Sequence, residues 1–550
     1  MTRGFTGHSY GTYAGGRERH GDTWVYTVRA SAMLRDTMGS VRLKRGLERG
    51  RLPLEAATAD VVGRVAVADA QDMEEALHGA AEAAARWAAI PAERRMRVVA
   101  EFHDLVREKA DDIIETMVAE GHPRLLARWE VAGMLANTGP LTRNWIAGQL
   151  EHRQTLGDRE LRLRRVPDGV VCLNPPQNAT VANALLGVWV LAGGNALVVR
   201  APRSAPLGVL HALHELVVPA LERAGAPAGL LAALCVPAAP ALQQWLDSPL
   251  VDDIMYFGGS EQGIAFGAAC VARGKKPILE LAGNDTVVVW RDADLDRAAD
   301  ALAEAFYGSG QICMVPNCAV VHPAVADALL ERLERRARAI RPGFPEEAGA
   351  LLSPVLRTDR FSEVLGQATA AGARLVCGGG RLDVHGRPDE VAGVFVEPTV
   401  VRVDGLKGAR DLDVVRHETF FPLLPVVVPE NLPDAELLPA VTAFVDANEY
   451  GLRHSLWADD PAVIDAYLAG VRGGGLVKVN DSHIGFLPLL PTHGGTGLTG
   501  GPGGEANFPA LRTTHLQGVS VGHGVRPREA VFGEERTGPA RTGDENERNH

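Results

Sequence analysis

The segment Thr-Val-Ala-Asn-Ala-Leu-Leu-Gly-Val-Trp-Val-Leu-Ala-Gly-Gly-Asn-Ala-Leu-Val-Val-Arg, residues 180–200, decides the fold. It is long and apolar enough to cross a membrane, but Gly187, Gly193 and Gly194 interrupt it. Its last residues, before Arg200, form a β-rich run. A buried helix followed by a parallel strand explains this pattern better, because strands covered on both faces read as continuous apolar runs. We therefore expect a globular α/β fold.

Strands alternate with helices on both sides of this segment. Between Val170 and Leu281, short apolar runs are separated by helical patterns over about 180–192, 206–223 and 240–246. Such a βαβ series predicts a doubly wound parallel sheet, which is suited to binding a dinucleotide. A second α/β series runs from Thr286 to about Val479.

The segments at the two ends of the chain, and the stretch 151–167, differ in composition from these α/β series. Residues 1 to about 22 are rich in Gly, Tyr and charge, so we expect a mobile start, followed by an ordered lead-in over 23–55. The alternating stretch 151–167, followed by Pro167-Asp168-Gly169, predicts a hairpin whose exposed arm pairs with another chain. Beyond Gly524 the chain has too little apolar content to fold, and we expect disorder there.

Composition excludes several classes of protein. The chain has 550 residues with 46% apolar content, which predicts more than one hydrophobic core. Its 68 acidic and 56 basic side chains give a net charge of −12, so we expect neither a nucleic-acid nor a membrane partner. Six cysteines without a Cys-x-x-Cys pair, and no apolar run for a signal peptide, predict a cytoplasmic protein without a metal site.

Polar residues follow the expected strands, where open α/β sheets bind ligands. In chain order these motifs are Asn174-Pro-Pro-Gln-Asn178, Arg200-Ala-Pro-Arg203, Phe257-Gly-Gly-Ser-Glu-Gln-Gly263, Glu280-Leu-Ala-Gly-Asn284, Gly310-Gln-Ile-Cys313 and His417-Glu-Thr-Phe-Phe-Pro422.

Together these motifs resemble the aldehyde dehydrogenase superfamily, in its order and approximate spacing, over about residues 55–522. The motif ending in Cys313 is similar to the family's nucleophile motif, and Glu280-Leu-Ala-Gly is similar to its general-base motif. Asn178 stands where the family places an oxyanion-holding asparagine. Glu418-Thr-Phe420 is similar to the Glu-x-Phe that holds the nicotinamide ribose.

The resemblance implies an α/β fold with a Rossmann-type cofactor domain, an α/β catalytic domain and a small β oligomerisation arm. Arms of this kind join subunits in the family, so a homodimer or homotetramer is expected. The implied limits are an N-terminal extension, partly disordered, at 1–54, the dinucleotide-binding domain at 55–147 and 168–282, the catalytic domain at 283–482, the arm at 148–167 and 505–522, including a strand near 509–521, and a disordered tail at 523–550.

The implied activity is the non-acylating oxidation of a small-molecule aldehyde to the carboxylic acid with NAD or NADP. In this chemistry the thiolate of Cys313 attacks the carbonyl carbon, because that carbon expels hydride readily only once it is tetrahedral. Asn178 would hold the oxyanion, and Glu280 would activate the water that releases the thioester.

The same resemblance implies a set of cofactor-binding residues. The family usually has Lys at the position of Arg200 and, in NAD-preferring members, Glu at the position of Arg203. Arg203 cannot accept hydrogen bonds from ribose hydroxyls, but its planar donors suit a 2′-phosphate, so we expect NADP to be tolerated. A solvent-facing Arg203 is the alternative. The implied set is Arg200, Arg203, Gly259, Ser260, Gly263, Glu418 and Phe420.

Two other functions stay open, and departures from the family's motifs prompt one of them, a homologue without turnover. Near Cys313, this chain has Gly308 and Cys318 where the family usually has larger polar residues. Ala282 stands in place of the first Gly of the general-base motif, and Phe421 stands in place of the Gly that follows the family's Glu-x-Phe. A CoA-acylating relative is one alternative, although such relatives generally lack the carboxylate at the position of Glu280. A homologue that binds without turnover is the other.

Structural interpretations of the same residues also stand. Glu280 alone is typical of an ion-paired carboxylate at a strand end, and Asn178 of a helix cap. His211 and His214 lie one helical turn apart, without the pattern of a zinc site, and favour a solvated helix face.

Overall fold

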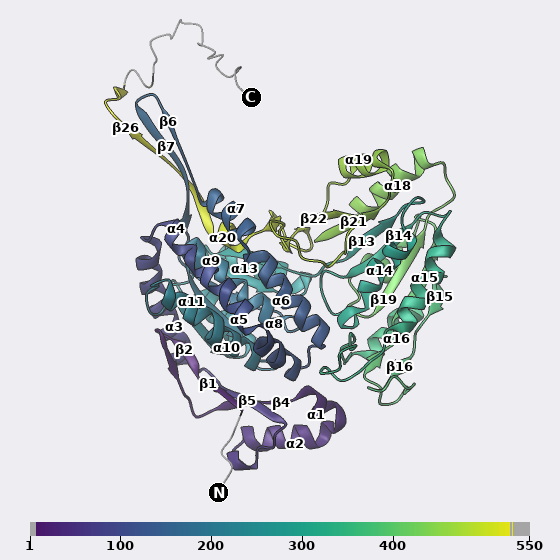
Figure 1. The fold of residues 1–550 in the computed structure, drawn as a ribbon, viewed down its shortest axis with the longest axis horizontal. Coiled ribbons are helices and arrows are strands. Elements are labelled where there is room, and N and C mark those ends of the chain that lie inside the picture. Colours follow the sequence, from purple (N-terminus) through teal and green to yellow (C-terminus); the bar gives the residue numbers. More distant parts are fainter. Residues whose placement is uncertain (1–6, 528–530, 532–550) are drawn as a thin grey trace, which may run out of the picture.

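The computed structural model describes residues 7–527 and 531, and it contains two seven-stranded sheets in separate lobes, with an arm projecting from the first (Figure 1). The expected tail beyond Gly524 falls mostly outside the described residues.

The first sheet has the strand order β12-β11-β8-β9-β10-β2-β3. Strands β8 to β12 are parallel, and β2 and β3 add an antiparallel edge. Since β8 lies between β9 and β11, the chain reverses its direction of winding there, and the carboxyl edge at such a point is where doubly wound sheets bind ligands. The strands are β2 (Thr12–Ala14), β3 (Arg17–Arg19), β8 (Val170–Asn174), β9 (Ala196–Ala201), β10 (Leu231–Cys235), β11 (Asp253–Phe257) and β12 (Lys276–Glu280).

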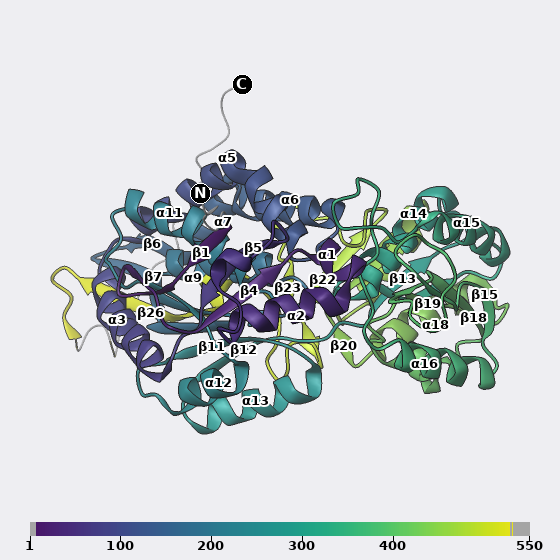
Figure 2. The same cartoon turned by 90° about the horizontal axis from the view of Figure 1, so that it is seen from below.

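Helices cover both faces of this sheet (Figures 1 and 2). They are α3 (Ala70–Ala88), α4 (Ala92–Arg95), α5 (Arg97–Ala119), α6 (Arg124–Thr138), α7 (Pro140–Leu150), α8 (Thr180–Leu185), α9 (Gly187–Gly193), α10 (Leu207–Ala212), the π-helical turn η2 (Leu213–Val217), α11 (Val218–Arg223), α12 (Ala238–Asp247) and α13 (Ser260–Ala272).

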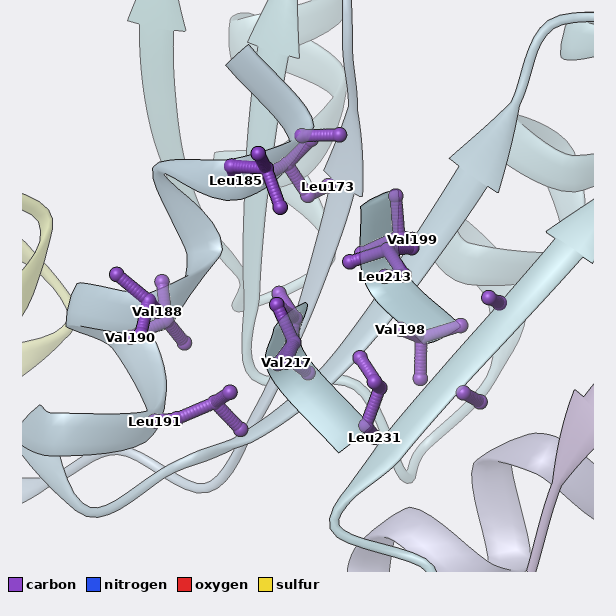
Figure 3. Close-up of a cluster of buried hydrophobic side chains, with 14 of the residues drawn as sticks. Leu173, Leu185, Val188, Val190, Leu191, Val198, Val199, Leu213, Val217 and Leu231 are labelled. Carbon is purple, nitrogen blue, oxygen red and sulfur yellow. The ribbon is translucent and has the colours of Figure 1, made fainter. Parts of the chain in front are cut away.

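Residues 180–200 form the buried helix and strand that the sequence predicts. Figure 3 shows Val198 and Val199 of β9 near leucine and valine side chains of η2 and β10, in a cluster that also contains the side chains of α9, and both valines are fully buried. The expected single helix is divided at Leu186, whose carbonyl accepts from the Trp189 N–H and tightens the turn. Gly187 then passes close to the sheet, where an added Cβ would lie 2.3 Å from Leu197. Among the described residues, no helix is long and apolar enough to span a membrane.

The second sheet has the strand order β15-β18-β19-β14-β13-β21-β22 and is parallel except at β15. Its strands are β13 (Asp285–Val289), β14 (Pro316–Val321), β15 (Arg374–Cys377), β18 (Thr399–Asp404), β19 (Leu423–Val428), β21 (Arg453–Trp457) and β22 (Leu476–Val479). The helices of this lobe are α14 (Leu295–Ala303), the 3-10 turns η3 (Glu304–Gly310) and η4 (Ala409–Asp411), α15 (Ala326–Ala339), α16 (Thr358–Ala370), α17 (Asp413–Arg416), α18 (Asp434–Asp446) and α19 (Pro461–Gly470). Short ladders pair β16 (Arg381–Leu382) with β17 (Phe395–Val396), and β20 (Tyr450–Gly451) with β24 (Thr496–Gly497).

The arm is a three-stranded sheet of order β26-β7-β6, formed by β6 (Glu151–Leu156), β7 (Arg159–Pro167) and β26 (Thr514–Gly522). The hairpin reverses at Gly157 and Asp158, where Gly157 has a φ of 54°, and Pro167 leads into β8 instead of forming the hairpin turn. The strand expected from residue 509 begins at Thr514, because Pro509 starts the short helix α20 (Pro509–Arg512), a position that proline favours.

The expectation of a mobile start is wrong for residues 8–19. Strand β1 (His8–Tyr10) pairs with β5 (Val61–Ala66), whose other neighbour is β4 (Trp24–Val28), while β2 joins the first sheet beside β10. Edge pairing satisfies the backbone of these strands without a large apolar content. The expected lead-in contains α1 (Ala30–Arg35), α2 (Thr37–Glu48) and the turn η1 (Leu54–Ala56).

His211 and His214 do not form a solvated face, because the first strand covers them. The Tyr10 hydroxyl lies 2.7 Å from His211 Nδ1, and His211 Nε2 lies 2.8 Å from Asp112 Oδ2. The rings of Tyr10 and His214 are 4.9 Å apart. These contacts fix the N-terminal strand to α5, α10 and η2.

Candidate functional site

A cavity of about 700 Å³ opens at the carboxyl edge of the first sheet, where β8 and β11 are neighbours. The loops after β8, β11 and β12 line it, and two segments of the second lobe, around Cys313 and around Glu418, close it. Of the ten predicted site residues, seven line this cavity: Asn178, Arg200, Gly259, Glu280, Cys313, Glu418 and Phe420. Arg203, Ser260 and Gly263 do not.

The backbone before Cys313 has a conformation that few residues adopt. Gly308, Ser309 and Gly310 have φ values of 61°, 58° and 69°. Ser309 is held in this strained region by its hydroxyl, which donates to the Ser353 carbonyl at 2.6 Å and accepts from the Ser353 N–H at 3.0 Å. The segment therefore turns sharply and directs Cys313 to the cavity.

Two glycines permit a very close approach of other segments to this turn. A Cβ on Gly310 would lie 2.1 Å from the Phe421 carbonyl oxygen, and a Cβ on Gly283 would lie 2.1 Å from the Cys313 carbonyl oxygen. Both clashes involve backbone atoms, which cannot move aside as a flexible side chain does. Glycine is required at both positions for this packing.

The Cys313 thiol is only partly exposed, and its surroundings disfavour the thiolate. Burial, followed by the nearby Glu418 and Asp285 carboxylates, raises the pKa of Cys313 to about 12, although Arg453 acts in the opposite direction. Burial also raises the pKa of Glu418 to about 8. Glu418 Oε1 accepts a single hydrogen bond at 3.3 Å, from the Gly283 N–H.

Glu280 lies at the end of β12 and is 6% exposed. It accepts hydrogen bonds of 2.6 Å from the Gly494 N–H and from the Asn507 amide. Strand β23 (His493–Gly494) pairs with β25 (Ala506–Asn507), which places both donors side by side. Burial raises the pKa of Glu280 to about 7 despite these two donors. It forms no ion pair with any described residue, so the interpretation as an ion-paired strand end is wrong.

Asn178 lies in the loop between β8 and α8. Its amide donates to the Gln311 carbonyl at 2.8 Å, two residues before Cys313, which leaves the second amide hydrogen available. The backbone carbonyl oxygen of Asn178 lies 3.1 Å from His122 Nε2. The side chain does not cap α8, so the interpretation as a helix cap is also wrong.

The turn between β11 and α13 fits the diphosphate of a dinucleotide. Ser260 is the first residue of α13, and its buried hydroxyl has no hydrogen-bond partner among the described residues. Gly258 and Gly259 precede it, and a helix N-terminus attracts anions. Gly263 has another role, because a Cβ there would lie 2.1 Å from Leu281 Cδ2, so this glycine lets α13 pack against the chain after β12.

The two predicted arginines have different surroundings. Arg200 is buried, and it donates to Asn174 Oδ1 at 2.5 Å and to the Val236 carbonyl at 3.3 Å. Arg203 is exposed and forms no hydrogen bond or ion pair with the described residues. Its positive charge nevertheless lowers the pKa of Cys235 at the end of β10, as do the charges of Arg200 and Lys44, although burial has the larger, opposite effect.

The wall of the cavity contains residues that the sequence motifs did not indicate. Trp129 and Phe486 stack with ring centroids 4.8 Å apart, and Glu130 and His493 line the same cavity. These residues come from α6 and from the chain after β22, far apart in the sequence. Asn507 also has no local signal, because its role depends on a two-residue ladder.

Comparison with known proteins identifies the family. A profile of the aldehyde dehydrogenase family matches residues 52–511. The chain belongs to this family. Members of the aldehyde dehydrogenase family are oxidoreductases, and this chain is an enzyme that oxidises an aldehyde to the acid with NAD or NADP.

Several curated relatives have similar lengths. The chain is 31% identical to a vanillin dehydrogenase of Amycolatopsis sp., over 84% of this chain and 91% of the relative. It is 29% identical to a glutarate-semialdehyde dehydrogenase of Pseudomonas aeruginosa, over 74% of this chain and 81% of that relative. It is 27% identical to the benzaldehyde dehydrogenase YfmT of Bacillus subtilis, over 84% and 91%.

Solved structures share the fold. A betaine aldehyde dehydrogenase from Staphylococcus aureus is 18% identical and matches with a TM-score of 0.77, over 96% of this chain and 98% of that one. An NAD-dependent aldehyde dehydrogenase from Sinorhizobium meliloti is 23% identical and matches with a TM-score of 0.75, over 94% of this chain and 95% of that one. The expected aldehyde-dehydrogenase fold is confirmed.

Replacing Glu418 with Gln should make Cys313 more reactive, but only at a pH where Glu418 is ionised. Above its pKa of about 8 the carboxylate raises the pKa of Cys313, so at pH 9 the variant should be alkylated by iodoacetamide about threefold to tenfold faster. At pH 6.5 position 418 is neutral in both proteins, and the rates should agree. Peptide mapping identifies Cys313, since the other five cysteines are buried. Equal rates at pH 9 would contradict the electrostatic coupling.

Proposed function

We propose that Cys313 is the nucleophile, Asn178 an oxyanion donor and Glu280 the general base of this aldehyde dehydrogenase. The observation that carries the proposal is their convergence. Three residues from three distant segments line one cavity, and Asn178 is hydrogen-bonded to the segment that ends in Cys313. Each side chain has the chemistry that one step of aldehyde oxidation needs.

The Cys313 sulfur, as thiolate, attacks the aldehyde carbon and forms a tetrahedral thiohemiacetal. The free hydrogen of the Asn178 amide and the backbone N–H of Cys313 stabilise the oxygen as its charge develops. Bound NAD(P)+ would supply the hydride acceptor of the oxidation, held at the α13 N-terminus by Ser260 and at the ribose by Glu418. Glu280 then takes a proton from the water that attacks the thioester, the acid leaves, and the Cys313 sulfur is regenerated.

The lining of the cavity favours a neutral aromatic aldehyde. Trp129 and Phe486 provide an apolar wall, while Glu130, Glu280 and Glu418 supply carboxyl groups. Among the described lining residues the single cation is Arg200, which is already bonded to Asn174 and Val236. The carboxylate of a semialdehyde, the kind of substrate named for some relatives, lacks a cationic partner here. The vanillin and benzaldehyde dehydrogenases named among the relatives support the aromatic class.

Hydrolysis of the thioester distinguishes this proposal from transfer to coenzyme A. The buried Glu280, with a pKa of about 7, is suited to activating water, which an acylating enzyme does not need. Turnover that requires coenzyme A would favour the acylating alternative. A protein that binds NAD(P) but oxidises no aldehyde would favour the non-catalytic one.

The arm supports the proposal of a homodimer or homotetramer. Leu156, Leu163 and Leu516 lie on its three strands and are 61%, 51% and 60% exposed. Exposed apolar side chains on a projecting sheet are typical of a surface that a second copy covers. We also propose the domain limits expected from the sequence, except that β2 and β3 join the first domain, and the cytoplasm as the compartment, which six free cysteines support.

Turnover at saturating substrate should rise with pH through about 7. Burial raises the pKa of Glu280 to about 7, and a base acts only when it has lost its proton, so activity is lost as the pH falls below this value. Glu280→Gln should lower kcat by roughly a hundredfold to ten-thousandfold and remove this pH limb. The exposed Glu82→Gln is the control. A wild-type pH profile retained in Glu280→Gln would contradict the role of Glu280.

Arg203→Glu should shift cofactor preference from NADP toward NAD. The substitution removes a cation that suits a 2′-phosphate and adds an acceptor for ribose hydroxyls. The ratio of kcat/KM with NADP to kcat/KM with NAD should therefore fall by about tenfold, which corresponds to roughly 1.4 kcal/mol. Arg472→Glu, at an exposed site on the second lobe, is the matched control. Wild-type enzyme that favours NAD by more than about tenfold, with no change in Arg203→Glu, would exclude the role of Arg203.

A further inference from the structure

Glu130 is a buried carboxyl group in the wall of the substrate cavity that the proposed mechanism does not use. It lies on α6 beside Trp129, is 5% exposed, and lines both the main cavity and a smaller cavity that shares some of its lining residues. Acidic side chains are rarely buried without a partner, because transfer of the group out of water must be offset by hydrogen bonds.

The polar neighbours of the carboxyl group are His122 and the Ala182 N–H, which lowers its pKa, yet one of its two oxygens has no hydrogen-bond partner among the described residues. Oε1 lies 3.5 Å from His122 Nε2. That nitrogen is nearer to another acceptor, the backbone carbonyl oxygen of Asn178, at 3.1 Å. Oε2 is buried and has no hydrogen-bond partner among the described residues. Since buried polar atoms in folded proteins are nearly always paired, a group that enters the cavity is a natural partner for this oxygen.

The other polar side chains nearby are already paired. Asn183 donates to the Ala179 carbonyl at 2.7 Å, and its Oδ1 lies 2.8 Å from His493 Nε2. The second nitrogen of His493 lies 2.6 Å from the Thr492 hydroxyl. Of the described side chains that line the main cavity, Glu130 alone has a buried oxygen or nitrogen without a partner.

The charge of the site favours a neutral ligand group. Burial raises the pKa of Glu130 to about 8, so the carboxyl group is mostly protonated at neutral pH and offers both an O–H donor and an acceptor. Burial also lowers the pKa of the facing His122, which is therefore an uncharged imidazole. A neutral hydroxyl group matches such a site, because it donates and accepts in turn.

We propose that Glu130 is a specificity-determining residue that hydrogen-bonds a neutral hydroxyl group on the substrate, so that the enzyme prefers hydroxylated aromatic aldehydes. The inference rests on the proposed function, because it needs an aromatic aldehyde in this cavity. Trp129 and Phe486 contact the ring, and Glu130 binds the hydroxyl group at the same wall.

The test compares kcat/KM for 3- and 4-hydroxybenzaldehyde with kcat/KM for benzaldehyde, at pH 6.5. Glu130→Met keeps the side-chain volume but removes both hydrogen-bonding functions. We expect it to lower the preference for at least one hydroxylated substrate by about tenfold to a hundredfold while benzaldehyde oxidation changes little. Glu82→Met, at an exposed position on α3, is the matched control and should change neither value.

A second comparison needs only the wild-type enzyme. A methyl group has nearly the size of a hydroxyl group but cannot hydrogen-bond, so the hydroxybenzaldehydes should be preferred over the corresponding methylbenzaldehydes by about tenfold or more. Equal values would overturn the subsite even if Glu130→Met does not fold.

Other outcomes also decide the matter. A parallel loss for benzaldehyde and its hydroxylated forms in Glu130→Met would assign Glu130 a structural role, and an unchanged preference would mean that water satisfies Oε2. Stronger preference for an aminomethyl-substituted benzaldehyde would replace the neutral group with a cation. Wild-type enzyme that oxidises aliphatic but no aromatic aldehydes would contradict the proposed substrate class, and the subsite with it.

Discussion

The site depends on three backbone segments that approach more closely than any side chain would permit. The turn Gly308–Gly310 passes against Phe421 on one side, and Gly283 meets the Cys313 carbonyl oxygen on the other. A Cβ at Gly283 or Gly310 would lie 2.1 Å from a backbone oxygen, so the constraint is steric and absolute. Through it, the chain after β12 and the chain before β19 fix the position of Cys313. Ser309, the one residue of the turn with a side chain, is held by two hydrogen bonds to Ser353.

Glu280 is fixed by a different kind of constraint, which closes the site from its other end. Its two donors come from a ladder that pairs His493–Gly494 with Ala506–Asn507, more than two hundred residues later in the chain. These bonds hold the carboxyl group in place, while burial keeps its pKa near 7. A strand end of the first sheet, a turn of the second lobe and a late ladder thus form one cavity. Neither lobe contains all of the proposed catalytic residues.

Sequence patterns predicted the parts of the fold that follow from local rules. The apolar periodicity of residues 180–200 and the polar motifs after each strand indicated the parallel sheet and seven of the residues that line the cavity at its carboxyl edge. Glu130, Phe486 and Asn507 could not be predicted, because their positions depend on long-range packing and carry no local pattern. Residues 8–19 could not be recognised as ordered, because the pairing of β1 with β5 and of β2 with β10, and the Tyr10–His211 contact, are long-range interactions that compensate for a polar composition.

The central claim is that Cys313 carries the acyl group and that Glu280 releases it. The most direct measurement is the mass of Glu280→Gln after incubation with benzaldehyde and NAD(P)+, quenched in acid and mapped by peptide. The account predicts one equivalent of reduced cofactor per active site and a benzoyl group on the peptide that contains Cys313. Reduced cofactor without an adduct, or an adduct on any of the other five cysteines, would contradict it.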